Sequence, residues 1–338
     1  METTKLNKII PAFIAVVLLL AVFVVAKSVI IPAVLSVFIS FLLMPVIRWL
    51  TKKKVPLVPA SLLSLAIIIA VLFLLAFLLI VSLKSLNREL PFYTERMREI
   101  IATVLFMVKS HGLEINGADI LNELDPSQIA GFVGKGMLSF VGVISNLVLI
   151  FFITLFILME SQRFKEKSEK AFSKESPILK STHQIGEQMQ RYIIWKTVIS
   201  LGTGICVWIF LAIVGVDFAL LWGLLTFLLN FIPSVGSIFA SVPPVLIALL
   251  QFESPILYAV ITLIGLIAIQ MVIGNYIDPK ILGRELNLSP LIVFLNMVLW
   301  GFLWGVIGML ISTPLLVCVK VIISHNKDLK PIAIMLEE

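Results

Sequence analysis

The segment from residue 230 to residue 237 interrupts a long apolar run with residues that break helices and form hydrogen bonds. These residues are Asn230, Pro233, Ser234, Gly236 and Ser237. Proline lacks an N–H and glycine tolerates a positive φ, so a helix that reaches this segment should end near Asn230. The free helix ends and the Asn and Ser side chains could then bind a cation or a polar solute. We therefore predict a solute site here, with a purely structural proline kink as the alternative.

Polar residues also follow the next apolar run. Gln270 lies among apolar residues, where its amide needs an interhelical partner, and Asn275 follows it shortly afterwards. Asp278 could carry a proton or a cation at the membrane boundary. It could instead cap a helix and pair with Lys280 or Arg284. Both roles of Asp278 stay open on the sequence alone.

The last apolar stretch, residues 291–323, holds a third group of candidates. Asn296 lies early in this stretch, and several glycines separate it from Ser312 and Pro314. The Ser-x-Pro spacing also occurs at residues 241–243, after the first break, which indicates a weak internal repeat. Two broken apolar segments in one chain are typical of transporters.

None of the common catalytic or metal-binding motifs occurs in the sequence. It has no Gly-x-x-x-x-Gly-Lys loop, no Gly-x-Ser-x-Gly elbow, no His-Glu-x-x-His helix and no paired carboxylates. The histidines lie far apart, and Cys206 and Cys318 lie singly in apolar runs, where they should act as small hydrophobic residues. The sequence therefore predicts neither an enzyme nor a bound cofactor or metal.

The composition is that of a membrane protein. Hydrophobic residues make up 60% of the 338 residues and charged residues 14%, with a mean hydropathy of +1.10. In soluble globular chains, hydrophobic residues average about 45–50% and charged residues about 25%. We predict an all-α, polytopic helical membrane protein with about eight transmembrane elements, two of them broken or re-entrant, and a helical external insertion. The predicted elements are residues 9–26, 29–50, 59–83, 137–159, 192–214, 218–251, 255–273 and 291–323.

The charges of the loops predict the orientation in the membrane. The loop after the second element carries Arg48 and the lysines 52–54, so it should face the cytoplasm, together with both termini. Residues 84–135 carry six basic and seven acidic residues and should lie outside. Residues 160–196 carry eight basic and five acidic residues and should lie inside. The net charge of +6 thus reflects orientation in a lipid bilayer and does not indicate nucleic-acid binding.

The predicted outer segment, residues 84–135, has apolar residues at three- and four-residue spacing. This pattern predicts an amphipathic helix with Pro91 in its first turn, which could pack on the helical bundle or contact another subunit. We divide the chain into N-terminal transmembrane helices (1–83), this external insertion (84–135), a transmembrane helix (136–160), a cytoplasmic linker (161–190), a C-terminal transport region (191–324) and a cytoplasmic tail (325–338).

A series of short motifs runs along the chain. They are Gln190-Arg191-Tyr192, Asn230-x-x-Pro233-x-x-Gly236 with Pro243-Pro244, Asn275-x-x-x-Pro279-x-x-x-Gly283, Leu288-Ser289-Pro290, and Gly305-x-x-Gly308 with Pro314. In order and spacing this series resembles the autoinducer-2 exporter (AI-2E) family of bacterial permeases, over nearly the whole chain. The chain departs from the family pattern at Ser234, where an aromatic residue such as Tyr is usual, and at Ser237, where Pro is common.

The resemblance implies an inner-membrane exporter of a small polar metabolite, the quorum-sensing signal autoinducer-2 being the named substrate. Other members resemble sodium(lithium)/proton antiporters, and in that case Asp278 and Asp217 are the candidates that would carry protons or cations. The resemblance also implies a homo-oligomer, in particular a pentamer. A non-transporting membrane scaffold is the second alternative, although it leaves the polar residues at membrane depth without a purpose.

Overall fold

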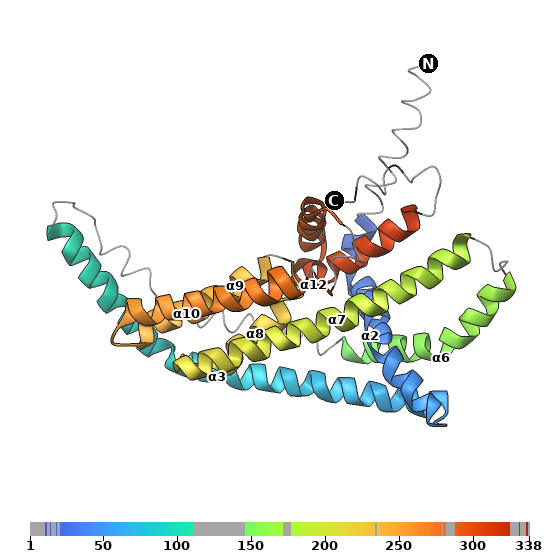
Figure 1. Ribbon diagram of the computed structural model, residues 1–338, viewed down its shortest axis with the longest axis horizontal. Helices are drawn as coiled ribbons and strands as arrows, with labels where there is room; N and C mark the ends of the chain where they lie inside the picture. The colour runs from blue at the N-terminus through green and yellow to red at the C-terminus, as the bar shows by residue number, and fades with distance from the viewer. Residues whose placement is uncertain are drawn as a thin grey trace, which may run out of the picture. The chain divides into compact units, whose positions relative to one another are not determined.

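The structure of the chain is a computed structural model that describes residues 21–110, 146–171, 177–233, 235–278, 280–281 and 288–324, together with residues 11, 14, 18, 331 and 336. These residues form helices and short connections, with no strand among them. The helices are α2 (Lys27–Lys52), α3 (Leu57–Ser110), α6 (Leu147–Ala171), α7 (Pro177–Val214), α8 (Ala219–Leu229), α9 (Val235–Gln251), α10 (Pro255–Gln270), the π-helix η1 (Met271–Ile277) and α12 (Pro290–Ser324), as Figure 1 shows.

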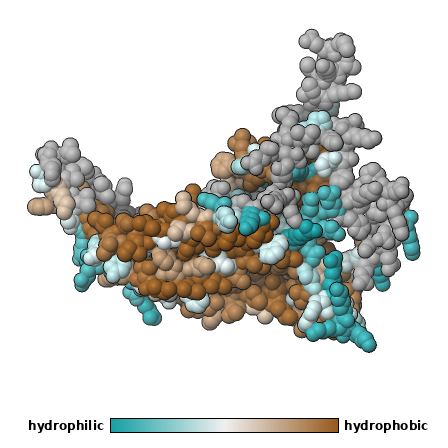
Figure 2. All heavy atoms as spheres, viewed as in Figure 1, coloured by the Kyte–Doolittle hydropathy of each residue, from teal (hydrophilic) through white to brown (hydrophobic). Residues whose placement is uncertain are grey.

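Five helical segments of the described part are long and apolar enough to cross a membrane: residues 27–52, 57–107, 186–214, 255–277 and 290–324. Shorter apolar helices accompany them at residues 147–161, 219–229 and 236–251. Large apolar side chains are exposed along these helices, and Figure 2 shows them over the visible face of α10. Lipid would cover such a surface. The prediction of a polytopic helical membrane protein is thus confirmed, although most of the predicted element 9–26 lies outside the described residues.

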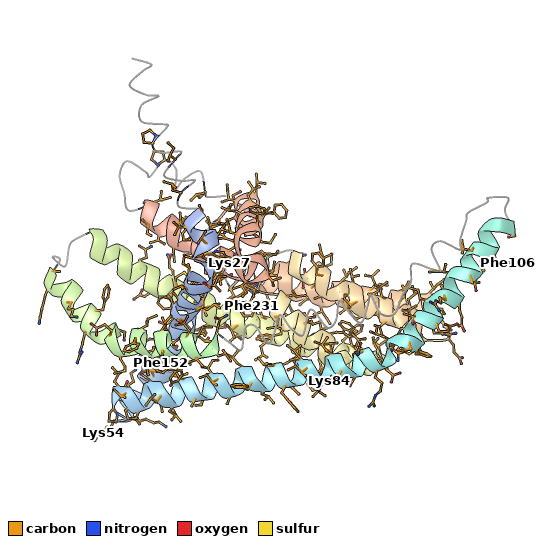
Figure 3. All side chains as sticks on the ribbon, turned by 180° about the vertical axis from the view of Figure 1, so that it is seen from behind. Lys27, Lys54, Lys84, Phe106, Phe152 and Phe231 are labelled. Atoms are coloured by element: carbon orange, nitrogen blue, oxygen red, sulfur yellow. The ribbon has the colours of Figure 1, made fainter. Side chains whose placement is uncertain are left out.

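Helix α3 is longer than the sequence pattern indicates. It continues without interruption from Leu57 to Ser110, and beyond Lys84 it turns toward Phe106 (Figure 3). Pro91 lies in the interior of this helix, so the expectation of a first-turn proline is wrong. A proline inside a helix removes one hydrogen bond, but buried side chains hold the helix on both sides of it, among them Leu86 and Tyr93. Residues 111–135 of the predicted insertion lie outside the described residues.

The described helices belong to two compact units. The first unit comprises residues 1–66, 146–194 and 283–338, and the second comprises residues 67–145 and 195–282. Helices α3 and α7 each contribute residues to both units. This division follows contacts in space, whereas the sequence divides the chain into consecutive transmembrane, external and cytoplasmic segments. The division into segments stays a prediction.

In the second unit, the first broken stretch is a helical hairpin. Helix α8 ends at Leu229, α9 begins at Val235, and a turn joins them. At the far ends of these helices, the side-chain oxygen of Gln251 accepts a hydrogen bond from the backbone N–H of Asp217, at 2.9 Å. Asp217 precedes α8 and Gln251 ends α9, so this bond joins the two ends that lie away from the turn, and α8 and α9 run antiparallel.

Glycines bring this hairpin close to α7 within the same unit. Gly204 of α7 and Gly223 of α8 face each other, and a Cβ on either would lie 2.7 or 2.8 Å from the carbonyl oxygen of the other. Small residues permit such close approach of helices in membranes. Leu211 of α7 and Leu221 of α8, both fully buried, belong to one apolar core together with Ala248 of α9. Helix α10 in turn packs along α9.

In the first unit, the second broken stretch is also a helical hairpin. Gly305 has a φ of 66° and a ψ of −146°, and the two arms of α12 meet at this residue (Figure 1). The Asn296 side-chain N–H₂ donates to the carbonyl oxygen of Ser312 at 2.7 Å. These residues would lie about 24 Å apart in one continuous helix, so the chain must reverse between them.

The second break lies at one of the glycines of this stretch and not at its Ser-x-Pro motif. Ser312 and Pro314 lie inside the second arm of α12, whereas the reversal occurs at Gly305. The positive φ of Gly305 explains why the chain reverses at this residue, because only glycine adopts this conformation without a steric penalty. Nearby, Gly308 packs so closely on the Trp300 carbonyl that any Cβ there would overlap its oxygen.

Candidate functional site

The first helix break lies where the sequence predicts it. Asn230 is the C-terminal cap of α8, and residues 231–233 form the turn that leads to α9. Gly236, however, lies within the first turn of α9 without a positive φ, so its expected role in redirecting the chain is wrong. Its role is close packing, because a Cβ at this position would overlap the carbonyl oxygen of Leu229. Ser234 lies outside the described residues.

Asn230 is buried and has a polar partner in α7. Its side-chain N–H₂ donates to the hydroxyl oxygen of Ser200 at 3.0 Å, and Ser200 is fully buried. Both polar groups therefore face protein, as polar groups at membrane depth must. The bond ties the tip of the α8–α9 hairpin to α7 in the same unit.

Asp278 forms an ion pair that the sequence analysis does not anticipate. The Lys196 ammonium lies 2.7 Å from Asp278 Oδ2, with 7% of the Lys196 side chain and 21% of the Asp278 side chain exposed. Lys280 lies over the Tyr276 ring instead, because residues two apart on a helix face different directions. Arg284 lies outside the described residues. The second oxygen of Asp278, Oδ1, is buried and has no hydrogen-bond partner in the described part of the chain.

The two polar pairs are neighbours. Lys196 and Ser200 stand four residues apart on α7, so they occupy one face of that helix, about 6 Å from each other. The tip of the α8–α9 hairpin and the C-terminal end of η1 thus reach adjacent turns of α7. We call Lys196, Ser200, Asn230 and Asp278 the polar cluster. Its member Asp278 directly follows the π-helix η1, and π-helical segments occur frequently at functional sites.

A groove between α9 and α10 contains further polar residues of the second unit. Its volume is about 430 Å³, and its walls are mostly apolar. Four polar residues line it, namely Ser237, Ser241, Gln270 and Asn275. Gln270 leans on Gly274, and no described residue supplies the interhelical hydrogen bond that the sequence analysis expects for it. An apolar groove with a few polar groups suits a small solute that carries both apolar and polar groups.

Asp217 lies at the opposite end of α8 from Asn230, about 20 Å away along the helix. Its carboxylate accepts a hydrogen bond from the Tyr93 hydroxyl at 2.6 Å, and its backbone carbonyl accepts one from the Trp222 indole at 2.9 Å. The structure therefore does not bring Asp217 and Asp278 together. Asp217 holds the base of the hairpin in place, beside a pocket that Ser85, Arg88 and Glu89 also line.

The candidates in the last apolar stretch belong to the first unit. Asn296 bonds across the hairpin to Ser312, and its side-chain oxygen accepts a hydrogen bond from the Trp300 indole at 3.1 Å. The Ser312 hydroxyl donates to the Met309 carbonyl, and Pro314 is buried in the same arm. These contacts give Asn296, Ser312 and Pro314 a structural role in the α12 hairpin.

Lys196 and Ser200 are the members of the polar cluster that the sequence analysis missed. The charges of the linker include Lys196, although Lys196 begins a long stretch that has no other charged residue. The signal that could have found both residues is the helical spacing of Lys196, Ser200 and Gly204, which places polar and small residues on one face.

The polar cluster offers groups that can bind a ligand. Asp278 Oδ1 can accept a hydrogen bond or contact a cation, and the Asn230 amide and the Ser200 hydroxyl can donate and accept. In the described ranges, no three His, Cys, Asp or Glu residues stand close enough to hold a metal ion. The arrangement fits the recognition of a polar solute that passes through.

Comparison with known proteins places the chain among transporters. The model of the AI-2E family transporter matches residues 13–328. A predicted transport protein of Haemophilus influenzae is 33% identical over 338 residues, which covers 98% of this chain and 97% of that protein. The AI-2 transport protein TqsA of Escherichia coli K12 is 31% identical over 314 residues, which covers 93% of this chain and 90% of TqsA. A predicted transport protein of Borreliella burgdorferi is 32% identical over 341 residues, with 98% and 91% covered.

Proposed function

This chain belongs to the AI-2E transporter family, and from that premise we propose that it exports a small polar metabolite across the bacterial inner membrane. The solute would pass the polar cluster of the second unit and the groove between α9 and α10. Autoinducer-2 is the first solute to test, because the relative TqsA is named as an AI-2 transport protein. The cytoplasmic position of both termini stays part of this proposal.

One observation carries the proposal: a helix break at Asn230 is buried beside an ion pair in which Asp278 Oδ1 has no partner among the described residues. A buried carboxylate oxygen without a donor is unfavourable unless something else binds it. A hydroxyl-bearing solute would supply that donor. Asn230 and Ser200, one turn of α7 away, could exchange their mutual hydrogen bond for bonds to the same solute at little cost.

Inverted membrane vesicles test the export of autoinducer-2. Vesicles that contain the protein should accumulate the compound faster than vesicles without it, and Asn230→Leu should reduce the rate about 2- to 13-fold, since one neutral hydrogen bond is worth about 0.5–1.5 kcal/mol. Asn87→Leu is the matched control, because Asn87 is an exposed residue of α3. Equal accumulation with and without the protein would remove autoinducer-2 as the substrate.

The ion pair also supports the second candidate, sodium(lithium)/proton antiport. A monovalent cation and a proton would alternate on the Asp278 carboxylate, and each would displace the Lys196 ammonium from it. Sodium or lithium added to pH-loaded proteoliposomes should cause a proton flux that Asp278→Asn abolishes and Glu253→Gln, on an exposed carboxylate, leaves unchanged. The absence of any flux would exclude this function.

A membrane scaffold without transport activity is the remaining alternative. It predicts that Asn230→Leu and Gln270→Leu leave function intact, because neither side chain would meet a solute. The transport proposal predicts the opposite for both. A homo-oligomeric assembly, in particular a pentamer, is compatible with any of the three functions and stays a proposal.

A further inference from the structure

The turn between α2 and α3, in the first unit, carries four basic side chains and no acidic one. Arg48 and Lys52 lie near the C-terminal end of α2, and Lys53 and Lys54 follow directly. All four are exposed, and positions 3–88 of the sequence contain no acidic residue. The ion pairs among the described residues involve none of the four. The turn therefore presents a concentrated positive charge that no described residue of the chain neutralises.

Lys54 adopts a backbone conformation that favours glycine. Its φ is 68°, and it is one of two non-glycine residues with a positive φ in the described part of the chain. The Lys54 N–H donates to the Thr51 carbonyl at 3.0 Å, and the Val55 N–H donates to the Leu50 carbonyl at 3.3 Å. These two bonds form the Schellman motif that ends many helices, and its left-handed position is usually occupied by glycine. Lysine at this position costs stability, so the fold alone does not account for the Lys54 side chain.

Trp49 lies beneath one of the lysines. The Lys53 ammonium is 3.8 Å from the centre of the Trp49 ring, which stands four residues earlier in the sequence. Trp49 is itself exposed. Tryptophan and lysine are enriched where membrane helices meet the lipid headgroups, because the ring suits the boundary and the ammonium reaches the polar side. This pair therefore marks the turn as a contact with lipid headgroups.

Exposed apolar side chains continue from the turn along both helices. Val46 belongs to α2, and Val58 and Leu62 stand four residues apart on α3. Both helices are long and apolar enough to cross a membrane, so the turn that joins them lies at a membrane surface. Figure 3 labels Lys54 at this turn. Basic groups next to exposed apolar side chains match the two parts of an anionic phospholipid, its phosphate and its acyl chains.

We infer that the turn formed by residues 48–54 is a binding site for one anionic phospholipid, whose headgroup phosphate contacts the basic side chains and whose acyl chains lie over Val46 and Val58. The Arg48 guanidinium and the lysine ammonium groups are donors that suit phosphate oxygens. The left-handed conformation of Lys54 adds a third consecutive ammonium group at the point where the chain turns back into the membrane. The binding of this lipid does not depend on which solute the protein transports.

Native mass spectrometry of the full-length protein in detergent tests this inference. The protein should bind phosphatidylglycerol at least about fivefold more tightly than phosphatidylcholine with the same acyl chains. Lys54→Gly should weaken the binding of phosphatidylglycerol about fivefold, the effect of one basic residue at an anionic membrane surface, and leave phosphatidylcholine binding unchanged. The same change should raise the midpoint of thermal unfolding in lipid-free detergent, because glycine adopts the positive φ without strain. A lysine without a ligand would give the rise in the midpoint alone.

Lys27→Gln is the matched control, because Lys27 is an exposed lysine at the opposite end of α2. It should leave the affinities for both lipids unchanged. Equal affinities for the two lipids, or an affinity for phosphatidylglycerol that Lys54→Gly does not alter, would overturn the inference. Inorganic phosphate that binds as tightly as phosphatidylglycerol would indicate a site for free anions and refute the assignment to a lipid. The export proposal is tested separately by its vesicle assay.

Discussion

Lys196 and Asp278 form a largely buried ion pair, and breaking it from one side should be costly. Lys196→Met leaves a carboxylate without its counter-ion, which costs about 3–5 kcal/mol when a pair is fully buried. The cost should be smaller here, because 21% of the Asp278 side chain is exposed. We expect a clear fall in the midpoint of thermal unfolding in detergent, and partial recovery in the double variant Lys196→Met/Asp278→Asn.

Lys84→Met is the control for this experiment, because Lys84 is exposed on α3. It should leave the unfolding midpoint unchanged. A double variant as unstable as Lys196→Met would show that the Lys196 side chain acts through packing and that its charge is secondary.

Glycines at close helix contacts provide a second prediction at this scale. Gly236→Ala places a methyl group on the Leu229 carbonyl, so it should destabilise the hairpin and reduce the amount of folded protein recovered in detergent. Gly202→Ala is the matched control: no atom lies within 4 Å of a Cβ there, and alanine favours helices by about 0.5–1 kcal/mol. Gly202→Ala should therefore preserve or raise the unfolding midpoint, and equal effects of both changes would contradict the role of Gly236.

Single residues show what can be predicted from sequence and what cannot. Asn230 is identifiable from the sequence alone, because a polar residue that ends a helix stands out in an apolar run. Its partner Ser200 lies 30 residues away, and serine in a membrane helix is too common to attract notice. One of the two open roles of Asp278 is pairing with a nearby basic residue, but its partner in the structure is Lys196, 82 residues away. Pairing across helices depends on packing, which one sequence does not record.

At the scale of helices, both broken stretches prove to be hairpins, and this gives a topological prediction. Single cysteines in place of Gly215 and Glu253, on a background without Cys206 and Cys318, should react with a membrane-impermeant thiol reagent from the same side. Cysteines in place of Ser289 and Ser324, at the two ends of α12, should likewise share one side. A stretch that crosses the membrane once would place its two ends on opposite sides, and that result would refute the hairpin.

Hydropathy does not distinguish a helical hairpin from a helix that crosses the membrane once. An apolar helix that reverses and one that continues have the same composition, and 35 apolar residues in α12 suit either. Proline was the obvious signal for a break, yet Pro91 and Pro314 both lie inside helices. Gly305 determines where α12 reverses, because the reversal uses a positive φ at this residue. The existence and type of most helices were predictable, but chain direction at the breaks was not.

For the whole molecule, the outer part of α3 is the feature that the transport site does not use. Beyond Lys84 this helix continues to Ser110 and exposes Phe92, Phe106 and Met107, which are 49%, 76% and 57% exposed. The loop charges predict that this segment lies outside the membrane, where large apolar side chains at such exposure favour contact with another protein surface. A second copy of this chain is the partner that the expected homo-oligomer supplies.

This reasoning predicts how the assembly responds to a change on α3. Phe106→Ser should weaken the homo-oligomer about 10- to 150-fold, since burial of one phenylalanine side chain is worth about 1.5–3 kcal/mol. Native mass spectrometry of the detergent-solubilised protein over a range of concentrations would measure the shift toward smaller species. Glu95→Ser, on an exposed polar residue of the same segment, should leave the distribution unchanged. An oligomer that persists unaltered in Phe106→Ser would mean that the subunits associate through their lipid-facing helices, and that the outer part of α3 serves another partner.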